Sequence, residues 1–238
     1  MTMTMLPECV TTVLFDVGNT LHHLDHEFIA AVINSHGSTV TARRVAEAEY
    51  IAKAMVDEEV RGKRLGRTDA TRQLPYYEVI MDELGVEPDR REAIGVELRE
   101  ENRRDSLWRV LHPQTPDVLK QLSQRGYTLG VISNADGRVP AALAASGIAP
   151  LFTAILDSHI VGVEKPDPRI FQMALEQCGA QPAESLYIGD IYEIDVVGSR
   201  AAGLTGVLLD PLGLYGRVDC IRIDSLARLL ELLPVSAR

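Results

Sequence analysis

From about residue 112 onward, the sequence alternates short apolar runs with segments of helical period, and this alternation constrains the fold more than any other feature. Short apolar runs bounded by turn residues are typical of strands buried in a parallel sheet. Strands that alternate with helices favour a doubly wound, Rossmann-like α/β sheet. We expect strands at 127–133, 151–156, 185–188 and 205–209, and one more short strand at 221–223 before a final helix at 225–233.

The first strand lies far from the others in the sequence. The run at 13–15 is apolar and stops at a turn that begins with Asp16. Between about residues 24 and 107, apolar residues recur at three- and four-residue steps, which predicts helices; one such set is Val45, Ala48, Ala52, Met55 and Val56. We therefore expect an α/β core domain and an all-helical domain inserted after the first strand, with these bounds: 1–22 and 110–238 for the core, and 23–109 for the insert.

The composition excludes several classes of partner. The chain has 34 acidic and 24 basic residues, a net charge of −10 with histidine neutral. We expect neither nucleic acid nor membrane as a partner, because so acidic a surface has no general attraction for anionic polymers or lipids. We also expect no signal peptide and no membrane span. The 3 cysteines form no close pair, which favours a reducing, cytoplasmic location.

Polar residues follow the predicted strands at the edge where an open α/β sheet binds its ligands. Asp16 follows the first strand, and Asp190 follows the strand at 185–188. Ser133 ends another strand, and Lys165 precedes a predicted helix. Carboxylates suit a hard divalent cation, while a hydroxyl and an ammonium group suit an anion. This set of groups predicts a site for an anionic, metal-bound substrate.

Four short segments resemble, in order, the motif series of the haloacid dehalogenase (HAD) superfamily: FDVGNTL at 15–21, ISN at 132–134, EKPDP at 164–168 and GDIYEID at 189–195. The helical insert resembles the cap of the first cap class of that superfamily. The resemblance covers nearly the whole chain. It implies a phosphatase-like, Mg²⁺-dependent phosphohydrolase that acts on a small phosphorylated metabolite through an aspartyl-phosphate intermediate.

The resemblance also implies roles at the metal. Asp16 matches the nucleophile that becomes phosphorylated, and its other oxygen is expected to bind Mg²⁺. The backbone carbonyl of Gly18 is expected to bind the same ion. Asp190 matches a direct metal ligand, and Asp195 matches the acid that supports the metal through water or hydrogen bonds.

A second group of residues matches the phosphate site of the superfamily. Ser133 and the adjacent Asn134 match the motif whose hydroxyl and backbone N–H groups hold phosphate oxygens. Lys165 matches the lysine that neutralises the nucleophile and the phosphate. Thr20 is expected to orient the first loop through its hydroxyl.

The chain departs from the phosphatase pattern Asp-x-Asp-Gly-Thr, because Gly18 stands where the second aspartate is usual. That aspartate protonates the leaving oxygen and then activates water, so its loss removes general acid–base help worth about 10²- to 10⁴-fold. Asn19 replaces a glycine, which is tolerable since asparagine enters the left-handed region more readily than most residues. The nearest candidates for a substitute acid are His22, His23 and His26.

Several alternatives stay open at this point. The chain could bind phosphate with little or no turnover. It could act as a phosphonatase-like hydrolase, which uses a cap lysine for a Schiff base, and the insert holds Lys53 and Lys63. A dehalogenase-like activity fits less well, because Asp190 preserves the metal motif. A receiver-like phosphoacceptor is disfavoured by the length and the helical insert.

Overall fold

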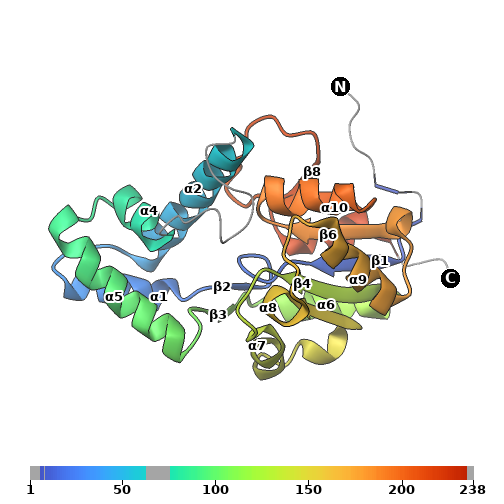
Figure 1. Ribbon diagram of the computed structural model, residues 1–238, viewed down its shortest axis with the longest axis horizontal. Helices are drawn as coiled ribbons and strands as arrows, with labels where there is room; N and C mark the ends of the chain where they lie inside the picture. The colour runs from blue at the N-terminus through green and yellow to red at the C-terminus, as the bar shows by residue number, and fades with distance from the viewer. Residues whose placement is uncertain (1–5, 8, 63–75, 235–238) are drawn as a thin grey trace.

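The computed structural model describes residues 6–7, 9–62 and 76–234. Its core is a 6-stranded sheet in the order β5-β4-β1-β6-β7-β8, in which every neighbouring pair is parallel. Figure 1 labels four of these strands, β1, β4, β6 and β8. The strands are β1 (Thr12–Phe15), β4 (Thr128–Ser133), β5 (Ala154–Asp157), β6 (Ser185–Gly189), β7 (Thr205–Leu209) and β8 (Ile221–Ile223). The doubly wound α/β fold expected from the sequence is therefore confirmed. β5 begins later than expected, because the 3₁₀ turn η1 (Ala149–Leu151) occupies the first part of that segment.

Helices cover both faces of the sheet. Successive residues of the central strand β1 point to opposite sides, so both faces present apolar side chains that the helices bury. Val13 and Phe15 pack in one apolar cluster with residues of α6 (Thr115–Gln124) and α11 (Leu229–Leu232). Leu14 packs on the other side with residues of α9 (Pro168–Cys178). The two clusters bury a continuous apolar strand on both faces, which is why β1 can form only in the middle of a sheet.

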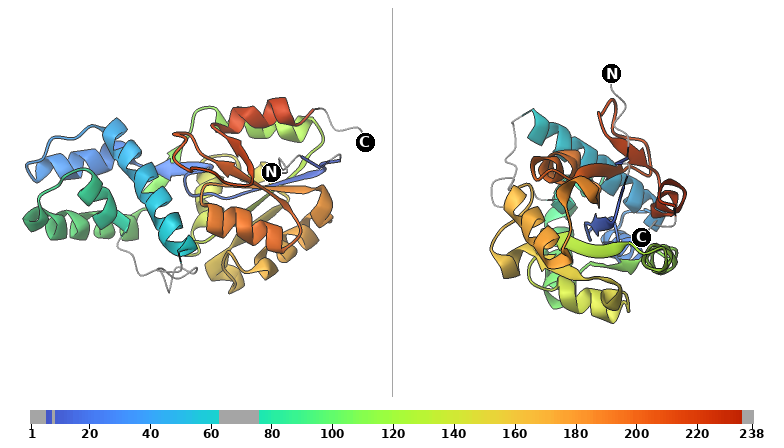
Figure 2. Two further views of the ribbon diagram at one scale, coloured as in Figure 1. Left: turned by 90° about the horizontal axis from the view of Figure 1, so that it is seen from above. Right: turned by 90° about the vertical axis from the view of Figure 1, so that its right-hand side faces the viewer.

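Short helices and turns connect the remaining strands, and Figure 2 shows them arranged around the sheet from two further sides. They are α7 (Val139–Ala145), α8 (Ser158–Val161), α10 (Val197–Ala201), the 3₁₀ turns η2 (Pro182–Glu184) and η4 (Leu226–Arg228), and the single π-helical turn η3 (Tyr192–Val196). The final helix expected at 225–233 is thus divided into η4 and α11. None of the described helices is long and apolar enough to cross a membrane.

The inserted segment has its own apolar core, formed by helices α1 (His26–Ser35), α2 (Ala42–Arg61), α4 (Tyr76–Glu83) and α5 (Pro88–Arg104). Val45, Ala48 and Ala52 of α2 lie in this core. Met55 was expected on the same apolar face, but 51% of it is exposed, so that expectation was wrong. These helices project from one end of the sheet (Figure 1). The predicted bounds of the insert, 22/23 and 109/110, fall within the segments 22–24 and 108–111. The division into two domains stays a prediction.

Local sequence explains where the inserted helices begin. The Asp25 carboxylate accepts a hydrogen bond from the Phe28 amide at 2.9 Å and caps α1. The Thr41 hydroxyl accepts one from the Arg44 amide at 3.2 Å and caps α2. Pro88 opens α5, where its missing N–H costs no helical hydrogen bond.

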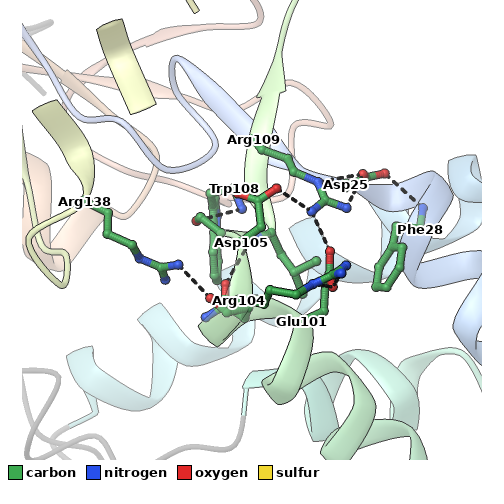
Figure 3. A network of polar contacts seen from close by, with 11 residues as sticks. Asp25, Phe28, Glu101, Arg104, Asp105, Trp108, Arg109 and Arg138 are labelled. Atoms are coloured by element: carbon green, nitrogen blue, oxygen red, sulfur yellow. Dashed lines mark hydrogen bonds and ion pairs between the residues drawn. The ribbon is translucent and has the colours of Figure 1, made fainter. Parts of the chain in front are cut away.

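Two short strands that the sequence did not predict join the insert to the core. β2 (His22–Leu24) and β3 (Trp108–Leu111) pair in antiparallel register. The guanidinium of Arg109 on β3 lies at the centre of the polar network in Figure 3. It donates to Asp25 at 3.0 Å, to Glu101 at 2.8 Å and to Asp105 at 3.0 Å. Arg109 therefore ties both connecting segments to the base of the inserted helices.

Candidate active site

The carboxyl ends of β4, β1 and β6 lie side by side and open into a cavity of about 570 Å³. This adjacency follows from the strand order, since β1 is flanked by the other two strands. The cavity lies between the core and the insert, and its lining includes Asp16, Ser133, Lys165 and Asp190 from the core, and Lys53 and Asn102 from the insert. The sequence expectation that these core side chains meet is therefore met by the geometry.

Lys165 links the buried groups of the site. Its Nζ donates to Oδ1 of Asp16 at 2.6 Å, to Oδ1 of Asp195 at 2.8 Å and to the Tyr187 hydroxyl at 2.8 Å. Only 2% of Lys165 is exposed. Burial opposes its charge, but Asp16 and Asp195 outweigh that effect and hold the pKa of Lys165 well above its usual value. Lys165 is thus a fixed positive charge beside Asp16.

Asp16 lies just beyond β1, and 7% of it is exposed. Burial raises the pKa of Asp16 to about 7, with Asp195 and Asp190 acting in the same direction and Lys165 acting against it. A nucleophilic carboxylate must be ionised. The site therefore needs more positive charge than Lys165 alone provides if Asp16 is to be fully ionised at neutral pH.

Asp195 orders the turn that carries Asp190. Its Oδ2 accepts hydrogen bonds from the amides of Asp190 at 3.1 Å and Ile191 at 2.9 Å. The Tyr215 hydroxyl donates to the Asp190 carbonyl at 2.8 Å and supports the same turn from the other side. Gly189 is required here, because a Cβ at this position would lie 2.3 Å from Cγ of Asp195.

Ser133 and Asn134 occupy the end of β4 in different ways. Ser133 is buried and lines the cavity. The Asn134 side chain instead holds the backbone of Lys165: its Oδ1 accepts from the Lys165 amide at 2.7 Å, and its Nδ2 donates to the Lys165 carbonyl at 2.9 Å. Asn134 therefore positions the lysine, a contact that the sequence did not reveal.

The first loop contains Gly18, Asn19 and Thr20. Asn19 has a φ of 56°, so asparagine does adopt the left-handed conformation expected at this position. Gly18 lines the cavity. The binding of a metal ion by its backbone carbonyl stays a prediction. Thr20 is 1% exposed and is absent from the described lining of the cavity, and its hydroxyl has no hydrogen-bond partner within the described residues. The loop-orienting role of Thr20 stays a prediction.

The insert contributes a lysine to the cavity. Lys53 of α2 is 3% exposed, and its Nζ lies 2.6 Å from Oδ2 of Asp190. Burial opposes the charge, but Asp190 and Glu49 outweigh it and raise the pKa of Lys53 above its usual value. Lys63, the other lysine noted in the insert, lies outside the described residues.

Of the three candidate histidines, His22 lines the described cavity. Its Nε2 lies 2.9 Å from Oγ of Ser146, and burial lowers its pKa. Burial and the charge of Lys53 lower the pKa of His23 to about 4. The His26 side chain is hydrogen-bonded to Glu49, with 2.5 Å between Nε2 and Oε2.

Comparison with known proteins identifies the family. The model of a family described as a haloacid dehalogenase-like hydrolase matches residues 10–203. This chain belongs to that family. A bovine haloacid dehalogenase-like hydrolase domain-containing protein 3 is 31% identical over 206 residues, which cover 82% of this chain and 80% of that protein. A phosphoserine phosphatase of Thermus thermophilus is 34% identical over 134 residues, 55% of this chain and 51% of that enzyme.

Solved structures of HAD-like proteins share the fold. A putative HAD-hydrolase of Bacillus subtilis, YfnB, has a TM-score of 0.67 and 22% identity over 95% of this chain and 99% of that one. A HAD phosphatase of Thermococcus onnurineus has a TM-score of 0.61 and 21% identity over 96% of this chain and 100% of that one. Some curated relatives match in part: the chain spans about half the length of the mouse domain-containing protein 3, with 37% identity over 130 residues and 53% of this chain covered.

The acidic groups of this HAD-like chain suit a divalent metal ion. Asp16, Asp190 and Asp195 are buried, and one carboxylate oxygen of each lies within 4.8 Å of the others. The two ammonium groups beside them leave one negative charge uncompensated if all three carboxylates are ionised. Hard carboxylate oxygens are the ligands that Mg²⁺ prefers, so the donor set and the charge both fit that ion.

Proposed function

We propose that this HAD-like hydrolase is a phosphatase, a Mg²⁺-dependent phosphohydrolase that acts on a small phosphorylated metabolite in the cytoplasm. The observation that carries the proposal is the position of Asp16, at the end of the central strand, 2.6 Å from the buried ammonium of Lys165 and within one cavity with Ser133 and Asp190. Relatives named phosphoserine phosphatase, glyceraldehyde 3-phosphate phosphatase and phosphoglycolate phosphatase support the substrate class. Free thiols at Cys9, Cys178 and Cys220 support a reducing compartment.

The proposed reaction has two halves. A carboxylate oxygen of Asp16 attacks the phosphorus of the substrate, the bond to the leaving oxygen breaks, and an aspartyl phosphate forms. Lys165 neutralises the charge that develops on the phosphate oxygens, and Ser133 donates a hydrogen bond to them. Water then attacks the phosphorus, releases inorganic phosphate and restores Asp16.

A bound Mg²⁺ would supply charge neutralisation at the phosphate and at Asp16. The residues that would hold it are Asp16, Asp190 and the Gly18 carbonyl, and Asp195 supports them through the turn amides. The inserted helices would exclude bulk water, since they form one wall of the cavity. We propose that residues 23–109 act in this way as a cap domain.

A Schiff-base mechanism at Lys53 is not favoured. Such chemistry requires a neutral amine, whereas Asp190 and Glu49 keep Lys53 protonated. A phosphate-binding protein with little turnover is the second candidate, and the observation in its favour is the absence of a carboxylate at Gly18.

The test is a transient-kinetic measurement with Mg²⁺ and an aryl phosphate. A phosphatase that lacks the second aspartate should release the aryl alcohol in a burst and then turn over slowly, because hydrolysis of the aspartyl phosphate has lost its base. Mass spectrometry of the quenched protein should find the phosphoryl group on Asp16, and Asp16→Asn should abolish both the burst and the adduct. Binding of phosphate without product release would instead favour the non-catalytic candidate.

A further inference from the structure

Three side chains on one stripe of α2 contact the turn that carries Asp190. Lys53, Asp57 and Arg61 are spaced four residues apart, so they lie one above the other on the same helix face. Lys53 contacts Asp190 at 2.6 Å. We call the contacts of these three residues with the turn 190–193 the α2 latch.

The other two members attach the latch to η3. Oδ1 of Asp57 accepts a hydrogen bond from the Glu193 amide at 2.7 Å. The guanidinium of Arg61 lies 2.9 Å from Oδ2 of Asp57 and 3.8 Å from the Glu193 carboxylate, and it stacks 4.9 Å from the centre of the Tyr192 ring. The inserted helices are thus held on the same turn that would supply a metal ligand.

The Lys53 ammonium group lies on the Asp190 carboxylate, the group that would bind a metal ion. Within the described residues, Lys165 neutralises Asp16 and Asp195, and Lys53 is the ammonium group on Asp190. Both partners of the Lys53–Asp190 pair are 4% exposed in their side chains, so neither charge is screened by bulk water. A divalent cation on the Asp190 carboxylate would lie within a few ångströms of the ammonium group, and the two positive charges would repel strongly in this buried setting.

We propose that Lys53 and a divalent cation compete for Asp190, so that metal binding releases the α2 latch and closure of the latch expels the metal. The inference rests on the metal site of the proposed function. Coupling of this kind is reciprocal: the free energy by which a bound metal ion destabilises the α2 latch equals the free energy by which the latch weakens metal binding. The contact of Lys53 with Asp190 and the binding of a divalent cation to Asp190 are therefore alternatives.

Neighbouring residues can stabilise the Lys53 ammonium group after it leaves Asp190. Glu49 lies one turn earlier on α2, is fully buried and acts electrostatically on Lys53. The ring of Tyr50 lies 4.1 Å from the Lys53 ammonium. When Lys53 leaves Asp190, Glu49 and the face of that ring keep it from becoming an uncompensated buried charge.

The first measurement is calorimetric titration with MgCl₂ alone. Lys53→Met should bind Mg²⁺ more tightly than the unaltered protein, by about 5- to 150-fold, the usual range for coupled sites. Arg138→Met is the matched control, because Arg138 lines the same cavity but pairs with Asp136 rather than Asp190. A similar gain in both variants would mean that the loss of any positive charge from the cavity strengthens Mg²⁺ binding, and it would overturn the proposal. An unchanged affinity in Lys53→Met would also overturn it.

The second measurement uses the unaltered protein and does not depend on the folding of a variant. Hydrogen exchange of the Glu193 amide reports the latch directly, since this N–H donates to Asp57. Saturating Mg²⁺ should make this amide exchange faster, and unchanged or slower exchange would overturn the proposal. If neither the unaltered protein nor Lys53→Met binds Mg²⁺, the metal site of the proposed function fails as well. If both bind equally, the metal site stands and the competition alone is wrong.

Discussion

The indole ring of Trp108 covers Gly18: its Cδ1 and Nε1 atoms each lie 3.5 Å from the position that a Cβ atom on Gly18 would take. That separation is an ordinary van der Waals contact, and the φ of Gly18 lies outside the left-handed region. Neither a close approach nor the backbone conformation therefore requires glycine here. A side chain at Gly18 would begin beside Trp108 at the wall of the cavity.

Gly18→Asp should restore the missing acid and base. We expect kcat/KM for an alkyl phosphate to rise about a hundredfold, the lower end of what general acid–base catalysis contributes. Gly18→Asn is the matched control, because it has the same size but cannot transfer a proton. Equal rates in the two variants, measured by steady-state kinetics with Mg²⁺, would exclude proton transfer as the missing function.

The unaltered protein should discriminate among leaving groups. Aryl and acyl phosphates depart as weak bases, whereas alkyl phosphates depart as strong bases that need a proton. We expect kcat/KM for an aryl phosphate to exceed that for an alkyl phosphate of similar size by about a hundredfold or more. Similar values for the two substrates would point to a substitute acid, and His22→Ala would then be the next variant, because His22 lines the cavity.

The strands of the sheet and the polar groups at its edge could be predicted from the sequence, because each strand there is a local apolar run that stops at a polar residue. The sequence was not sufficient for β2 and β3. Their pairing joins His22 to Leu111, far apart in the chain, and WRVL is a short run that follows a long charged helix after only 3 residues. Trp108, which covers Gly18, was missed for the same reason.

Lys53 shows a second limit of sequence reasoning. It lies between Ala52 and Ala54 on a helix whose apolar face was identified correctly at Ala48 and Ala52. A charged residue beside that face is usually solvated, and only the packing of α2 on the turn after β6 buries this one. The line of Glu49, Lys53 and Asp57 at four-residue spacing was the available signal, since three charged residues on one edge of a helix suit a polar partner.

Gly189→Ala should disturb the acidic turn. The added Cβ would lie 2.3 Å from Cγ of Asp195 and must displace that carboxylate from the turn amides. We expect the free energy of unfolding to fall by about 1–3 kcal/mol, the usual cost of overpacking. Gly216→Ala is the control, because nothing lies within 4 Å of its added Cβ. Urea unfolding of both variants checks this, and equal stabilities would mean that Asp195 can move freely.

The last prediction concerns Asp57, which is fully buried in the α2 latch. Burial raises its pKa from 3.8 to about 6, although the Glu193 amide and Arg61 favour the charged form. Because the folded-state pKa is raised, the proton stabilises the fold: this contribution is complete below about pH 4 and is lost as the pH rises through about 6. A shift of this size corresponds to about 3 kcal/mol.

Asp57→Asn cannot titrate, so the stability of the unaltered protein relative to this variant should fall by about that amount between pH 4 and pH 7. Urea unfolding of both proteins at several pH values measures the difference. A difference that stays flat or grows with pH would mean that Asp57 is held in the latch as a carboxylate.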